Sequence, residues 1–214
     1  MGTFDHPGAA RGEGVLNEGE LLLSCGTSWV GFFPVKNREI AIKNNMLIDP
    51  FLSEQGIWGA MFSLTSVSDR IKLYTGKYIC QGNEMFRELS LLSMQSCKGA
   101  NGAIIDIYDE PDDGIKQYPL CDIARAIMEG TARHLLVQIE KLKKDGITFN
   151  SAVMVGGPSE DSIWRMVLED ITGICIKSGR GSYSGATGAA IMAGIGVGIY
   201  ESEHDAAKQI MKEN

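Results

Sequence analysis

Two adjacent glycines, Gly156 and Gly157, follow the apolar run 151–155 and precede a segment that is typical of a helix. A strand that ends in two residues without side chains lets a flat or charged ligand approach the main chain closely. The start of the following helix offers N–H groups that have no partner inside the helix. Glu160 and Asp161 fall in the expected first turn, where their negative charge would repel a phosphate. The sugar or base of a nucleotide therefore fits this turn better than its phosphates do.

A second candidate is the sequence Ser24-Cys25-Gly26-Thr27-Ser28, which lies between the apolar runs 21–23 and 29–35. Two strands joined by a tight turn would place these residues at the tip of a hairpin. Hydroxyl groups and the free N–H groups of a glycine turn can surround a phosphate without a cation. An ordinary polar β-turn has the same composition, so this segment alone leaves both interpretations open.

Two further groups of residues could do chemistry, and each has a simpler explanation. Asp5 precedes His6 and Pro7, and Pro7 could open a short helix. A helix-capping or solvated carboxylate is the commoner role for such an aspartate, and His6 has no second histidine nearby. The acidic run 109–113 could hold a divalent ion, but it lacks the spacing of a calcium loop, so an exposed turn is expected.

The elements that must position these residues follow from hydrophobic periodicity. Apolar residues recur at three- and four-residue steps from Ile123 to Leu142, which predicts a long amphipathic helix that ends before Gly146. Other helices are expected at 67–78, 83–95, from 159 and from 185, with strands at 21–25, 29–35, 151–155 and 174–176, a strand pair within 40–52 and a possible strand at 103–105. Five glycines between 182 and 200 predict close packing of the last helix.

Composition narrows the class of protein. The chain has 214 residues, a formal charge of −7 and 44% apolar residues, which favours a substantial core and argues against a nucleic-acid surface. Five cysteines without a C-x-x-C pair argue against zinc or a disulfide framework and suit the reducing cytoplasm. No signal peptide is visible, and the run 182–200 falls short of a spanning helix, so no membrane partner is expected.

Five segments, in the same order, resemble the C-terminal domain of the FGGY carbohydrate kinases. The family's Gly-x-x-Asp, Ser-x-Gly-Thr-Ser, Arg-Ala-x-x-Glu-Gly, Gly-Gly and Gly-Ala-Ala patterns are similar to residues 2–7, 23–28, 124–130, 155–159 and 185–190. Each pattern alone is weak, but five in register are specific. The resemblance implies an α/β fold, an actin-like (ribonuclease H-like) ATPase lobe with a mixed β-sheet and helices on both faces, and one nucleotide-binding domain over residues 1–214.

The resemblance also implies a reaction and its participants. ATP or ADP with Mg²⁺ would be the cofactor, and a small sugar or polyol the substrate. Asp5 matches the family's general base, which would accept the proton of the sugar hydroxyl. Gly26 and Thr27 would face the β- and γ-phosphates, and Gly156 and Gly157 would lie against adenosine and the α-phosphate.

Three more positions take their roles from the resemblance. Gly59 would be a further phosphate-facing glycine. Asp161 lies where several members carry asparagine beside the nucleotide. Glu129 would be structural and would tie its helix to a neighbour.

The family's N-terminal lobe, with an Asp-x-Gly-Thr motif and most sugar contacts, is not represented in this sequence. The chain is therefore expected to be one half of a two-lobed kinase, to need that lobe as a partner and to be inactive alone. One alternative is a dinucleotide-binding enzyme, but the glycines at 179, 181 and 185 miss the required spacing. The other is a non-catalytic actin-like module, with homodimers formed through an exposed apolar interface.

Overall fold

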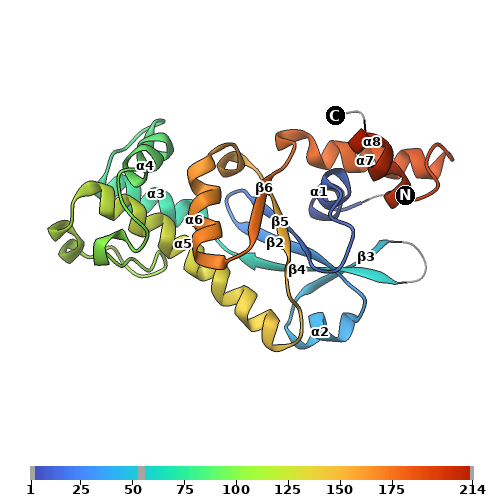
Figure 1. Cartoon of the computed structure of the whole chain (residues 1–214), viewed down its shortest axis with the longest axis horizontal. Coiled ribbons are helices and arrows are strands. Elements are labelled where there is room, and N and C mark those ends of the chain that lie inside the picture. The colour runs from blue at the N-terminus through green and yellow to red at the C-terminus, as the bar shows by residue number, and fades with distance from the viewer. Residues whose placement is uncertain (1–2, 53–55, 213–214) are drawn as a thin grey trace.

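The computed structural model describes residues 3–52 and 56–212, and a six-stranded sheet forms its centre (Figure 1). The strand order is β3-β4-β2-β1-β5-β6. The strands are β1 (Glu20–Cys25), β2 (Trp29–Val35), β3 (Leu47–Leu52), β4 (Ile57–Leu64), β5 (Ser151–Val155) and β6 (Cys175–Ser178). Strand β5 runs parallel to both β1 and β6, whereas the β1–β2, β2–β4 and β3–β4 pairs are antiparallel. The predicted mixed sheet is therefore confirmed.

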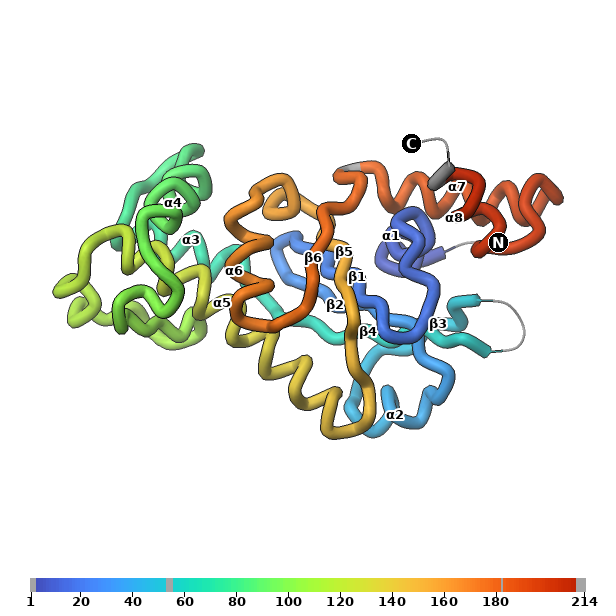
Figure 2. The backbone as a smooth tube through the Cα atoms, viewed as in Figure 1, coloured from blue at the N-terminus to red at the C-terminus, as the bar shows by residue number. Residues whose placement is uncertain are grey.

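Helices cover both faces of the sheet, as predicted (Figures 1 and 2). Helices α5 (Leu120–Lys144) and α6 (Ser162–Thr172) pack on one face, and α1 (Asp5–Glu13) lies on the other with α7 (Ser184–Gly196) and α8 (Glu203–Lys212) packed against it. Strand β1 contributes side chains to the core on each face. Leu21 and Leu23 join the core that contains α5 and α6, while Leu22 joins the core that contains α1. Because side chains alternate along a strand, an unbroken leucine run fits a strand that is buried on both faces.

The chain leaves the sheet after β4 and forms a helical arm, the part at the left of Figures 1 and 2. The arm contains α3 (Val67–Tyr78) and α4 (Met85–Ser93), close to their predicted bounds, followed by an irregular segment. The strand expected at 103–105 is wrong, because these residues join no sheet. Side chains of α3 hold the irregular segment instead: the Tyr74 hydroxyl donates to Asp106 O at 2.8 Å, and the Tyr78 hydroxyl donates to Asp112 O at 2.8 Å.

The strand pair expected within 40–52 is wrong in its first half. Residues Arg38–Lys43 form helix α2, and β3 pairs with β4. Asn37 caps this helix, since its side chain accepts a hydrogen bond from Glu39 N at 3.0 Å. Ala41 is the one buried residue of α2. The apolar residues of this segment therefore make little contact with the core, although their pattern resembles that of a buried strand.

The close packing predicted for the glycine-rich helix that starts near residue 185 is confirmed at the contact between α1 and α7. A Cβ atom placed on Gly188 would lie 1.8 Å from Gly8 O, and one placed on Gly12 would lie 2.0 Å from Ser184 O. Only glycine lets the two main chains approach this closely. Within the described residues, no helix is long and apolar enough to cross a membrane.

Candidate functional site

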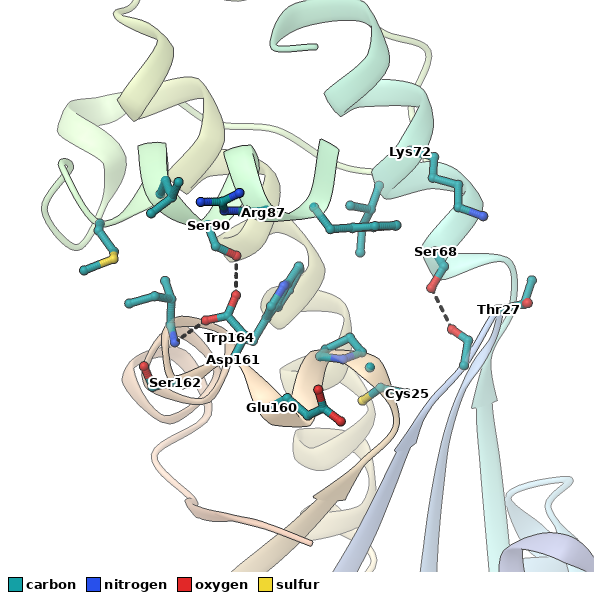
Figure 3. Close-up of a pocket in the computed structure, with 18 residues that line it drawn as sticks. Cys25, Thr27, Ser68, Lys72, Arg87, Ser90, Glu160, Asp161, Ser162 and Trp164 are labelled. Atoms are coloured by element: carbon teal, nitrogen blue, oxygen red, sulfur yellow. Dashed lines mark hydrogen bonds between the residues drawn. The ribbon is translucent and has the colours of Figure 1, made fainter. Parts of the chain in front are cut away.

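A pocket of about 760 Å³ lies between the β1–β2 hairpin tip, helices α3 and α4, and the turn that leads into α6 (Figure 3). Four of the predicted nucleotide-contacting residues line it: Gly26, Thr27, Gly157 and Asp161. The fold therefore brings together two segments that are far apart in the chain.

The hairpin tip is held in place by the first turn of α3. The Ser68 hydroxyl donates to Gly26 O at 2.6 Å, and Ser68 N donates to Thr27 O at 3.0 Å. A Cβ atom placed on Gly26 would have Ser28 O, at 3.6 Å, as its nearest neighbour. Packing alone therefore does not require a glycine here, and the space beside Gly26 is available to a ligand.

The two glycines after β5 have different physical roles. Gly156 has φ +97° and ψ 177°, and a Cβ atom placed on it would lie 2.4 Å from Cys25 O. Gly156 is thus required for the ends of β1 and β5 to meet. A Cβ atom placed on Gly157 would meet nothing within 4 Å, so Gly157 leaves open space at the wall of the pocket.

The helix that was expected from Ser159 begins later. Gly157–Glu160 form a 3₁₀ turn, α6 starts at Ser162, and Asp161 is its N-cap. Asp161 Oδ1 accepts from Ile163 N at 2.8 Å, and Oδ2 accepts a hydrogen bond from the Ser90 hydroxyl of α4. A carboxylate is favourable at an N-cap because it meets unpaired N–H groups. It also gives this end of the pocket a negative charge.

Asp5, Gly59 and Gly156 do not line this pocket. Asp5 begins α1, on the opposite face of the sheet from α5 and α6; its side chain is 76% exposed, and its Oδ2 lies 3.8 Å from His6 Nε2. Gly59 lies within β4, where a Cβ atom would be 2.4 Å from the ring of Phe32. That ring packs edge-on against Phe51, so Gly59 makes room for an aromatic pair.

The helical arm contributes residues to the pocket that were not predicted from the sequence. The pocket is lined by Ser68 and Lys72 of α3, by Phe86 and Ser90 of α4, and by Met94, which directly follows α4. A signal was available in part, because Ser68 and Lys72 are four residues apart and so share one face of the predicted helix. Nothing in the sequence showed that this face meets the hairpin tip.

The residues at the hairpin end of the pocket do not by themselves fit a magnesium ion. Mg²⁺ prefers carboxylate and phosphate oxygens, and the hairpin tip offers only main-chain groups and the Thr27 hydroxyl. Within the described ranges, no group of three or more His, Cys, Asp or Glu is arranged to hold a metal. The acidic run 109–113 is an exposed turn, as expected, and Asp113 forms ion pairs with Lys77 at 3.1 Å and Lys116 at 3.0 Å.

Cys25 lines the pocket, and its thiol is expected to be unreactive in the folded chain. It is 3% exposed, and burial raises the pKa of the Cys25 thiol well above its ordinary value. With iodoacetamide near pH 8, the exposed Cys97 and Cys175 should be alkylated first, and Cys25 only after unfolding in urea. Peptide mass spectrometry over time measures this order. Alkylation of Cys25 in the native chain as fast as that of Cys97 would contradict the expectation.

The architecture, a mixed sheet with a pocket beside its hairpin, is the actin-like ATPase fold, as comparison with solved structures shows. Xylulose kinase from Rhodospirillum rubrum superposes with a TM-score of 0.79 at 16% identity, over 96% of this chain and 44% of that one. Glycerol kinase from Plasmodium falciparum, solved with ADP, gives a TM-score of 0.74 at 19% identity, over 96% and 44% of the two chains. At these identities the likeness shows the fold, which confirms the predicted class.

The chain belongs to the FGGY family of carbohydrate kinases, whose C-terminal domain matches residues 90–197. Xylulose kinase from Staphylococcus epidermidis is 25% identical over 226 residues, which cover 99% of this chain and 45% of the relative. The chain thus spans less than half the length of this curated relative. The resemblance seen in the five sequence segments is confirmed.

Proposed function

We propose that this chain, over residues 1–214, is the nucleotide-binding domain of an ATP-dependent kinase that phosphorylates a hydroxyl of a small sugar or polyol. The observation that carries the proposal is the meeting of Gly26, Thr27 and Gly157 in one pocket. Each comes from a segment that resembles a nucleotide-contacting pattern of the family. Because ATP is the donor, a cytoplasmic setting is part of this proposal.

The charges of the pocket support one orientation of the nucleotide. Glu160 and Asp161 put two carboxylates beside α6, where a phosphate would be repelled and an uncharged base or sugar would not. The hairpin tip offers neutral hydrogen-bonding groups instead. The charges therefore assign adenosine to the side of Gly156 and Gly157, and the β- and γ-phosphates to Gly26 and Thr27. The α-phosphate, which joins the two, takes its place beside Gly156 and Gly157 from the family resemblance alone.

Asp5 is proposed as the general base on the sugar hydroxyl. Phosphoryl transfer depends mainly on positioning and charge stabilisation, and one carboxylate that orients the nucleophile suits it. Since the Asp5 side chain is exposed and outside the pocket, the sugar would lie between this chain and an N-terminal kinase lobe. Magnesium, when bound, would neutralise phosphate charge, and it would enter with the nucleotide.

Calorimetric titration with ADP and Mg²⁺ tests the nucleotide site. The wild-type chain should bind, and Gly157→Trp should abolish binding, because the indole would fill open space in the pocket. Gly196→Trp is the matched control: Gly196 is exposed at the end of α7, and its Cβ position also meets nothing within 4 Å. Circular dichroism checks that each variant folds. A folded wild type that binds no ADP would contradict the proposal and favour the non-catalytic actin-like module.

A further inference from the structure

The charged side chains that line the pocket come from different elements. Among the described lining residues the carboxylates are Glu160 and Asp161, beside α6, and the cations are Lys72 and Arg87, on α3 and α4. A nucleoside diphosphate carries its charge at one end only. The position of the two cations relative to the hairpin tip therefore decides which of them meets the phosphates.

Helix α3 places Lys72 at the hairpin end of the pocket. Ser68 anchors α3 to the tip through its bonds to Gly26 O and Thr27 O, and Lys72 follows one helical turn later on the same face. Figure 3 shows Lys72 on the same side as Ser68 and Thr27, with Asp161 on the opposite side. The lysine thus lies where the β- and γ-phosphates are proposed.

The two cations also differ in how firmly they are paired. Arg87 Nη1 lies 3.2 Å from Glu84 Oε2, within hydrogen-bond distance. Lys72 Nζ lies 3.8 Å from Asp69 Oδ1, too far for a hydrogen bond, and its side chain is 51% exposed. Because exposed pairs of this kind contribute little, a phosphate competes easily for the lysine.

We infer that Lys72 binds the terminal phosphates of the nucleotide. The inference rests on the proposed function and adds a cation to a phosphate site that otherwise consists of main-chain groups and a hydroxyl. An ammonium group acts as a compact charge with three donors on a flexible stem, which suits phosphates that change position between ATP and ADP.

The test compares the affinities of ADP and adenosine for five forms of the full chain: the wild type, Lys72→Gln, Lys72→Arg, Arg87→Gln and Lys177→Gln. Lys72→Gln should weaken ADP binding about five- to tenfold and leave adenosine binding unchanged, since only ADP has phosphates. Lys72→Arg should retain most of the ADP affinity because it keeps the charge. Lys177→Gln is the matched control: it removes the same charge from an exposed position on β6, outside the pocket, and should change neither affinity.

Each other outcome overturns the inference in a recognisable way. Unchanged ADP affinity in Lys72→Gln excludes the phosphate contact, and an equal loss for ADP and adenosine indicates an effect on the whole pocket. A selective loss of ADP binding in Arg87→Gln, with Lys72→Gln unaffected, would assign the role to Arg87. A folded wild type that binds neither ligand would contradict the proposed function itself, whereas the other results are compatible with it.

Discussion

Replacing Gly156 by alanine is expected to lower the free energy of unfolding by about 3 kcal/mol and to weaken ADP binding. A φ of +97° with ψ of 177° lies in a region that is essentially restricted to glycine and costs other residues about 1–3 kcal/mol. The added methyl group would also lie 2.4 Å from Cys25 O. That oxygen is main chain at the end of β1, next to the Ser24–Val155 pair of the sheet, so relief would require the two strands to separate.

Gly157→Ala is the matched control, because it makes the same chemical change one residue later. Its methyl group would meet nothing within 4 Å, and we expect a change of less than about 0.5 kcal/mol. Urea denaturation of both variants measures the difference. Equal destabilisation would show that the diglycine turn adjusts as a unit and that the proximity of Gly156 to Cys25 is not the constraint. Together with Gly157→Trp, this pair separates the glycine that builds the turn from the one that leaves room for a ligand.

The regular parts of the fold could be predicted from the sequence because their buried residues recur at regular intervals along the chain. The apolar repeat from Ile123 to Leu142 matches the buried side of α5, and the run Leu21–Leu23 matches a strand buried on both faces. The segment 103–105 looked like a strand because it is apolar, yet its neighbours Asp106 and Asp112 are held by tyrosines of α3. Such side chain to main chain bonds between distant segments leave no periodic signal.

The site was predicted to the extent that its residues carry local motifs. The hairpin tip and the diglycine turn were both found, and the structure places them at one pocket. Ser90 and Lys72 were missed, since a helix motif does not reveal which distant turn its polar face meets. Gly59 illustrates a second limit of prediction from the sequence. A glycine that faces a phosphate and a glycine that faces the ring of Phe32 look the same in the sequence, and only their neighbours in the structure distinguish them.

Glu129→Ala should be the most destabilising change in α5, with a loss of about 3–5 kcal/mol in the free energy of unfolding. Glu129 is 1% exposed and accepts hydrogen bonds from Gly99 N at 2.8 Å, from Arg125 Nε at 2.8 Å and from Arg133 Nη2 at 3.1 Å. Arg125 is itself 2% exposed and also donates to Asp170 Oδ2 of α6 at 2.8 Å. Removing the carboxylate leaves a buried cation with one partner fewer and a main-chain N–H without its acceptor.

Glu140→Ala on the same helix is the control, because Glu140 is an exposed residue paired with Lys143 at 3.3 Å, and its loss should cost less than about 0.5 kcal/mol. Glu129→Gln should fall between the two, since the amide keeps the volume and one acceptor oxygen. Urea denaturation ranks the three variants. The network joins α5 to α6, which carries Asp161 at the pocket, so Glu129→Ala should also weaken ADP binding where the chain is still folded. If Glu129→Ala lowers the free energy of unfolding no more than Glu140→Ala does, water replaces the buried carboxylate without a loss of stability, and the prediction is wrong.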